Sequence, residues 1–284
     1  MEAYYKEITD KIQKIAYKLL DEGKVDKIIG FGKGEFTDEV TPVFIVNKEN
    51  VDKLLFSEKA TPFLAKYLLN YKDEKVAITA KPCETRAINS YLSENLLQRE
   101  NLIIIGINGC RGIEGNTACK ECDVRNPVIS DYTVGEELSD EEVSSMITNV
   151  YEDLENMNPE ERNEYFQNEF ERCTRCYACR EACPVCYCEE CFTDSNQPFW
   201  LDSSTQLKDT FTFHLMRSIH MAGRCINCGA CEMACPENID VRALSAKMYR
   251  AGEEIFDYKP GMDPEQKTLL AEYDVNDQEK GFLD

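Results

Sequence analysis

The chain has 284 residues, a formal net charge of −21 and 15 cysteines. This length is enough for one large domain or two smaller ones, each with its own core. The strong negative charge makes nucleic acids and anionic membrane surfaces poor partners. The sequence has no long apolar run and begins without an apolar signal segment, so it predicts a cytoplasmic protein with no membrane insertion.

An N-terminal helix and two strands are predicted first. Apolar residues recur at helical spacing near the start of the chain: Ile8, Ile12, Ile15 and Leu19. We therefore assign residues 1–23 to an N-terminal helix, followed by strands over 25–30 and 42–46 and a short helix over 50–55. The glycine run at 30–34 lacks the G-x-G-x-x-G pattern of a dinucleotide site. We interpret it as a turn, with a phosphate-binding loop as the alternative.

A parallel sheet is predicted within residues 24–135. There, 75–80 is a short apolar strand, 84–97 has helical spacing, and 102–105 is a buried strand. A strand, a helix and a strand at this spacing form a right-handed parallel βαβ unit. Loops after the carboxyl ends of parallel strands are where such sheets bind ligands.

Four cysteines lie in these loops or close to them. Cys83 follows the first strand of the unit and Cys110 follows the second, while Cys119 and Cys122 form a C-x2-C pair shortly afterwards. Both loops open at the same edge of the sheet, so we predict that the four thiols converge on an iron–sulfur cluster. The alternative is that Cys83 and Cys110 are buried as small apolar side chains and that the C-x2-C pair is half of a zinc site.

An acidic helical connector is predicted over residues 136–164. Asp, Glu and Asn dominate this part of the sequence, and four apolar residues keep a helical spacing: Val143, Met146, Val150 and Leu154. The connector leads into the part of the chain that contains most of the remaining cysteines.

A doubled cysteine motif occupies the predicted module at 165–245. Both copies read C-x2-C-x2-C-x3-C-P, the spacing with which bacterial-type ferredoxins hold 4Fe–4S clusters. Three closely spaced thiols face three corners of a cube, and the fourth thiol belongs to the other cluster of the pair. Zinc, the alternative, would use paired C-x2-C hooks. The two expected ligand sets are Cys173, Cys176, Cys179 with Cys235, and Cys225, Cys228, Cys231 with Cys183.

The insert between the two motifs is harder to interpret. Its thiols, Cys186, Cys188 and Cys191, either hold a further cluster completed by a distant ligand or shield a neighbouring cube. His214 and His220, the two histidines of the chain, lie on a predicted helix. We interpret both as packed or hydrogen-bonded side chains and not as ligands.

The last segment, 246–284, is predicted to be an acidic C-terminal arm. Prolines and a glycine interrupt it, yet it keeps several apolar side chains, so its composition is not that of a plainly disordered tail. We interpret it as an arm that lies on a neighbouring subunit. Taken together, the sequence predicts an α+β protein. An N-terminal α/β domain with a parallel sheet comes first, and a helical connector and a C-terminal dicluster ferredoxin-like module follow.

Three stretches of the α/β part resemble a known family, the beta subunits of deazaflavin-coenzyme-reducing hydrogenase and dehydrogenase, which includes beta subunits of cytoplasmic formate dehydrogenases. They are Ala80–Ala87, Ile105–Cys110 and Cys119–Pro127. The dicluster segment is similar to relatives that accompany heterodisulfide-reductase-type complexes. The resemblance implies that the α/β domain can carry FAD and that Cys83, Cys110, Cys119 and Cys122 can hold a cubane cluster. Many members place the ferredoxin motifs before the α/β domain, whereas here they follow it.

Two functions are consistent with these features. The first is an iron–sulfur electron-transfer subunit of a multi-subunit cytoplasmic oxidoreductase, such as a formate dehydrogenase, a hydrogenase or a heterodisulfide-reductase-type complex. It is favoured because the sequence shows no catalytic acid/base pair, no activated nucleophile and no phosphate loop. The second is an enzyme subunit in which FAD exchanges a hydride with a deazaflavin or nicotinamide coenzyme. The expected partners are other redox subunits, with no nucleic acid among them.

Overall fold

A five-stranded sheet forms the N-terminal half of the computed structural model, which describes residues 2–36 and 38–269. The strand order is β2-β1-β3-β4-β5. Four of the strands run parallel, and β2 (Val40–Ile45) pairs antiparallel with β1 at one edge. The parallel strands are β1 (Lys27–Lys33), β3 (Val76–Ala80), β4 (Leu102–Ile107) and β5 (Tyr132–Val134). The predicted parallel sheet is therefore confirmed, with β3 beside β4.

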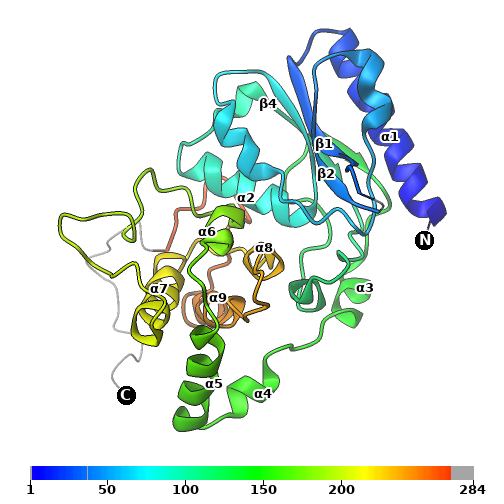
Figure 1. Ribbon diagram of the computed structural model, residues 1–284. Coiled ribbons are helices and arrows are strands. Elements are labelled where there is room, and N and C mark those ends of the chain that lie inside the picture. The colour runs from blue at the N-terminus through cyan, green and yellow to red at the C-terminus, as the bar shows by residue number, and fades with distance from the viewer. Residues whose placement is uncertain (1, 37, 270–284) are drawn as a thin grey trace.

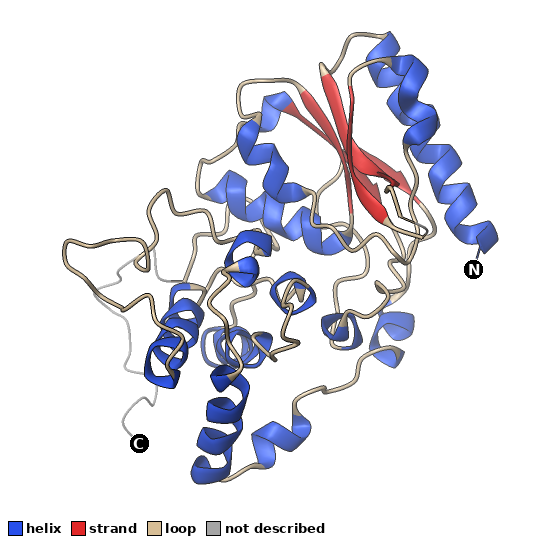
Figure 2. Ribbon diagram, in the orientation of Figure 1, coloured by secondary structure: helices blue, strands red, loops and turns tan. Residues whose placement is uncertain are grey.

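Helices cover both faces of this sheet (Figure 1; Figure 2). α1 (Glu2–Asp21) packs its predicted apolar stripe on one face, and α2 (Pro82–Ser93) lies on the other. Every residue of β3 is buried, as expected for a parallel strand covered on both sides. Four 3-10 helices connect these elements: η1 (Lys48–Lys53), η2 (Ala65–Asn70), η3 (Arg99–Asn101) and η4 (Thr117–Lys120). The helix predicted at 50–55 is thus the 3-10 helix η1.

The glycine run that was predicted to be a turn lies mostly inside β1. A Cβ atom at Gly30 would come within 2.3 Å of Leu54 Cδ2, and one at Gly32 within 2.4 Å of Val43 Cγ1. These close approaches require glycine because neighbouring segments press against the strand. The turn prediction is therefore wrong at 30–33, and so is the alternative of a phosphate-binding loop there.

The connector is helical but interrupted. α3 (Asp140–Ser145) begins at a capping box in which Ser139 and Glu142 bond each other's backbone N–H. α4 (Glu152–Asn156) is a single short helix. α5 (Pro159–Glu171) begins at a second capping box, formed by Asn158 and Glu161. The continuous helical spacing from Val143 to Leu154 did not reveal that the chain turns between α3 and α4.

The C-terminal half packs helices around the cysteine motifs. Its elements are α6 (Ala178–Ala182), α7 (Leu207–His220), α8 (Ala230–Met233) and α9 (Arg242–Phe256). α7 packs between α5 and α9, and α6 contacts α8. A second apolar core, separate from that of the sheet, includes Phe166 and Phe170 of α5 and Phe213 of α7. This half therefore has its own core, and several of the motif cysteines lie in that core or pack against it.

After α9 the chain returns to the α/β half. The carbonyl oxygen of Pro260 accepts a hydrogen bond from Arg86 Nε at 3.0 Å, and that of Gly261 accepts one from Asn89 Nδ2 at 3.1 Å. Both donors lie on α2, so residues 257–261 pack on the same chain. α9 itself crosses the predicted boundary at 245/246. Part of the predicted arm, 270–284, lies outside the described residues, and its contact with a neighbouring subunit stays a prediction.

Candidate iron–sulfur centres

The two C-x2-C-x2-C-x3-C-P motifs fold into the same loop. Each motif has two residues with positive φ. One lies two positions after the first cysteine, and the other directly follows the second cysteine. The four residues are Arg175 and Tyr177 in the first motif, and Asn227 and Gly229 in the second. Such alternation turns successive backbone N–H groups toward one centre, an arrangement known from anion and iron–sulfur sites. In the first loop, Arg175 N–H points at Cys173 Sγ with N and Sγ 3.4 Å apart.

Each motif supplies one cysteine to the other motif's cavity. The first cavity is walled by Cys173, Cys176, Cys179 and Cys235. The second cavity is walled by Cys225, Cys228, Cys231 and Cys183. α6 lies against α8, and this contact brings each fourth cysteine across. The structure thus gathers the two sets that the ferredoxin spacing predicts, and four thiols around one cavity are the donor set that a cubane cluster requires. Ligation itself stays a prediction.

Burial disfavours the charged form of these thiols. It raises the pKa of Cys179 to about 12 and that of Cys225 to about 12. Thiolates packed together in an apolar cavity repel one another, so they are stable only beside positive charge. The iron of a cluster would supply that charge, because metal-bound thiols lose their protons.

Aromatic side chains surround the first cavity. His214 is 3 % exposed and stacks on Phe170, with ring centroids 4.4 Å apart. Its Nε2 lies 3.3 Å from Cys173 Sγ. Burial, together with the charges of Arg217 and Arg175, lowers the pKa of His214 to about 3, so the ring is neutral. As expected, this histidine is a packed and hydrogen-bonded side chain. The sequence did not reveal that this histidine contacts the sulfur of a predicted ligand, Cys173.

A third cavity lies at the carboxyl edge of the sheet. Cys83 comes from the first turn of α2 and Cys110 from the loop after β4, and both line this cavity together with Cys119 and Cys122. The four thiols therefore meet as the strand order predicts. Burial raises the pKa of Cys110 to about 11, so this cavity resembles the other two in its chemistry. Whether it holds a cluster stays a prediction.

Arg125 holds the loop of the third cavity in place. Its buried guanidinium donates to the carbonyl oxygens of Cys110, Cys119 and Cys122, at 3.2, 2.5 and 3.0 Å. One side chain thus ties together three of the four cysteine positions. Sequence reasoning missed this role, although the arginine follows the C-x2-C pair at a fixed short spacing.

The third cavity lies directly against the second. Cys228 of the second set also lines the third cavity. Asn116 Nδ2 donates to the carbonyl oxygen of Cys228 at 2.9 Å. Gly229 is required here, because a Cβ would come within 2.1 Å of Asn116 Oδ1. The second and third thiol-lined cavities are therefore adjacent, and the crossed cysteines Cys183 and Cys235 connect the first cavity to the second.

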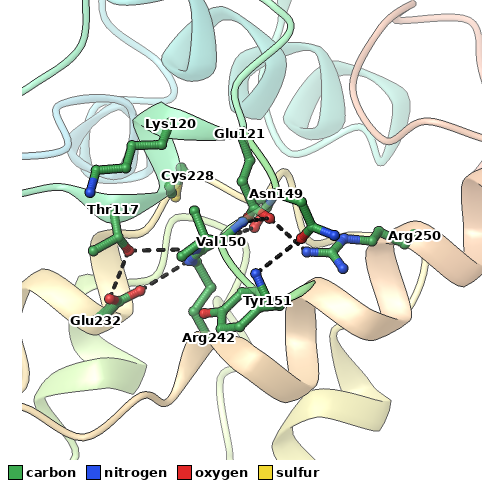
Figure 3. A network of polar contacts seen from close by, with 12 residues as sticks. Thr117, Lys120, Glu121, Asn149, Val150, Tyr151, Cys228, Glu232, Arg242 and Arg250 are labelled. Carbon is green, nitrogen blue, oxygen red and sulfur yellow. Dashed lines mark hydrogen bonds and ion pairs between the residues drawn. The ribbon is translucent and has the colours of Figure 1, made fainter. Parts of the chain in front are cut away.

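A polar network joins the third loop to the C-terminal half (Figure 3). Arg242 of α9 pairs with Glu121 at 2.7 Å and with Glu232 at 3.0 Å, and Arg250 pairs with Glu121 at 2.6 Å. Thr117 donates to Glu232 at 2.8 Å. Arg242 and Glu121 are buried or nearly so, where ion pairs fix geometry because a lost partner is costly. The network therefore fixes the third loop relative to α8 and α9.

The cysteines of the insert are placed differently. Cys186, Cys188 and Cys191 line an open hollow of about 1340 Å³ and none of the three thiol-lined cavities. His220, the other histidine, lines the same hollow. In the described part of the chain, no group of three or more His, Cys, Asp or Glu side chains has the arrangement needed to hold a single metal ion. A further cluster at these three thiols stays a prediction.

Comparison with known proteins identifies the relatives of the chain. A family model described as a 4Fe-4S dicluster domain matches residues 169–239. The F420-dependent formate dehydrogenase subunit beta of Methanocaldococcus jannaschii is 22 % identical over 345 residues, covering 86 % of this chain and 89 % of that protein. The F420-dependent formate dehydrogenase 1 subunit beta of Methanococcus maripaludis is 24 % identical over 355 residues, with 89 % and 90 % covered. The predicted resemblance is confirmed.

The 4Fe–4S dicluster domain and these beta-subunit relatives fit an iron–sulfur electron-transfer subunit, the first of the two functions that the sequence favours. The predicted α+β fold is confirmed as well. Among the described residues, none of the helices is both long and apolar enough to cross a membrane.

Proposed function

We propose that this chain is the beta-type electron-transfer subunit of a multi-subunit oxidoreductase and carries three 4Fe–4S clusters. The observation that carries the proposal is a set of three neighbouring cavities with four predicted ligand cysteines each, Cys228 of the second set also lining the third cavity. A protein that only needed structural metal would have no reason to place three such sites in direct succession. A series of adjacent one-electron centres is what transfer between two partners requires.

In this proposal the chain's own residues hold and insulate the clusters. The crossed cysteines bind the first two cubes, and Cys83, Cys110, Cys119 and Cys122 bind the third. When bound, the clusters supply one-electron redox chemistry. The α/β domain (24–135), the connector (136–164) and the dicluster module (165–245) then act as one unit, since the second and third cavities share a wall. The partner would be a catalytic subunit of the formate dehydrogenase, hydrogenase or heterodisulfide-reductase type.

A flavin-containing enzyme subunit is the second candidate. The relatives are named F420-dependent, and the open hollow is wide and has aromatic walls formed by Phe63, Tyr67 and Phe192. Phe63 also lines the third cavity, so a flavin in the hollow would lie beside a cluster. In this function FAD would exchange a hydride with a deazaflavin or nicotinamide, and the cubes would collect single electrons. A further cluster at Cys186, Cys188 and Cys191 would occupy the same wall of the hollow.

Metal and flavin analysis of anaerobically purified protein tests these proposals. Three cubes would give about twelve irons per chain, and the ferredoxin pair alone about eight. The double variant Cys119→Ser/Cys122→Ser should lose about four irons and keep the paired cubes. Eight irons in the wild type, with zinc present, would overturn the third cluster. Acid-released FAD would favour the enzyme subunit, and proteins that copurify from the host would identify the complex.

A further inference from the structure

Arg217 of α7 is a buried charge beside the second cavity. Its side chain is 4 % exposed and forms part of the cavity wall. Its Nη2 donates to the carbonyl oxygen of Cys179 at 3.1 Å. Its Nε is buried, and no hydrogen-bond partner for it exists among the described residues. An orphaned N–H at a buried site calls for an explanation, because leaving such a donor unpaired is costly.

Thiols, and not carboxylates, surround this guanidinium. The cysteines that act on it electrostatically are Cys231 and Cys183 of the second set, Cys179 of the first set, and Cys186. In the part of the chain that the structure describes, no carboxylate forms an ion pair with Arg217. Arg242 lines the same cavity, but Glu121 and Glu232 neutralise its charge. Arg217 therefore contributes a full positive charge to the second cavity, and arginine keeps that charge at every physiological pH.

A fixed cation beside a cluster favours the reduced state. Reduction adds one electron to the cube and makes it more negative, and the electron comes from a one-electron donor such as a reduced partner subunit. The attraction between the added charge and a nearby guanidinium is strong in a buried site, because little water screens it. No proton moves, since arginine does not titrate in this range.

Resting on the proposed function, we infer that Arg217 is a positioning residue that helps to set which cube holds an electron. It raises the reduction potential of the second cube, the one held by Cys225, Cys228, Cys231 and Cys183, above the potential that its cysteines alone would give. The unpaired Nε–H leaves the guanidinium a free donor as well as a charge beside this cavity. The middle centre of the series thereby holds the electron more readily than it otherwise would.

The test is a mediated redox titration of the complex, followed by electron paramagnetic resonance. Signals are assigned to each cube with Cys183→Ser and Cys235→Ser. Arg217→Met should lower the ratio of reduced to oxidised second cube about tenfold at a fixed potential, which is about 59 mV for a one-electron couple. The first cube should shift less, because Arg217 lines the second cavity and not the first. Arg217→Lys keeps the charge and should keep most of the potential.

Arg224→Met is the matched control. Arg224, which follows α7 in the chain and lines the open hollow, is paired with Glu94 at 2.9 Å, so its replacement should leave both potentials unchanged. If Arg217→Met loses iron, Arg217→Gln keeps polar donors without charge and should show the same shift. Unchanged potentials in the neutral variants, or equal shifts for Lys and Met, would overturn the inference. Absence of two cubes from the wild type would instead overturn the proposed function itself.

Discussion

The two cysteine motifs have the same spacing and the same loop conformation, yet their surroundings differ. The first cavity lies in an aromatic core with Phe213 and His214, and the buried Arg175 forms part of its wall. The second cavity has Arg217 and Arg242 in its wall and lies against the α/β half. Ligand spacing therefore decides where a cube can form, whereas the neighbouring side chains decide how readily it accepts an electron.

One position shows the difference most clearly. After the second cysteine, the first motif has Tyr177 and the second has Gly229, both with positive φ. A side chain in this conformation costs roughly 1–2 kcal/mol. In the first motif the Tyr177 hydroxyl accepts a hydrogen bond from Arg175 at 2.7 Å and its ring packs edge-on against Phe213. In the second motif the space is taken by Asn116. The first motif is closed by its own side chain, and the second by the α/β half.

The largest expected effect comes from replacing the fourth cysteine of each motif in turn. Cys235→Ser should remove the first cube and spare the second, although Cys235 belongs to the second motif. Cys183→Ser should do the reverse. Each variant should lose about four irons, and electron paramagnetic resonance of the reduced protein would show which signal disappears. Loss of the cube nearest in sequence would show that the two motifs bind independently.

Arg125→Met extends the comparison to the third cavity. Removing the guanidinium leaves three buried carbonyl oxygens without their donor, so the loop that positions three of the four thiols should open. We expect about four irons fewer per chain and unchanged signals from the paired cubes. Arg99→Met, which removes a half-exposed partner of Asp131 in the same domain, should retain all iron. Full iron content in Arg125→Met would contradict the role given to this side chain.

Gly229→Ala tests whether the second motif is closed by the α/β half. Strain from the positive φ and the clash with Asn116 should together destabilise the protein by roughly 2–3 kcal/mol. Gly23→Ala is the control, because Gly23 has φ +61° and nothing within 4 Å of its would-be Cβ, so only strain of about 1 kcal/mol is expected. The melting temperature, followed by cluster absorbance under argon, should fall more for Gly229→Ala. Equal falls in melting temperature would mean that Asn116 moves aside at no cost in stability.

The smallest expected effect concerns the neutral hydrogen bond to the first cube. His214→Phe keeps the stacking on Phe170 but removes the ring nitrogen Nε2 that lies 3.3 Å from Cys173 Sγ. Loss of this hydrogen bond should destabilise the reduced, more negative cluster more than the oxidised one. The reduction potential of the first cube should therefore fall by roughly 20–60 mV. His220→Phe is the matched control, because the ring of His220 contacts Phe192 and not a predicted ligand. An unchanged first potential in the redox titration would show that His214 serves packing alone.

The sequence was sufficient for the parts of the site that depend on spacing. The doubled motif predicted the crossed sets, and the strand–helix–strand order predicted that Cys83 and Cys110 would meet. The sequence was insufficient where a contact depends on which other element packs against a helix or a strand. His214 and Arg217 lie three residues apart and so share a face of α7, yet nothing in the sequence says that cysteine loops cover that face. Gly30 was misinterpreted for the same reason, since its packing against Leu54 is a tertiary contact.

The docking of the C-terminal segment on α2 also bears on how the protein matures. Arg86, three positions after Cys83, is satisfied by the carbonyl groups of Ile226 and Pro260, which are 140 and 174 positions further along the chain. Ribosomal synthesis makes the N-terminal part first. The cysteines of the sheet edge are thus the earliest to leave the ribosome, long before the residues between Ile226 and Met233 that complete the wall of their cavity. Any metal they hold is enclosed only after this part of the C-terminal half has been translated, so completion of this centre reports that both halves of the chain are in place.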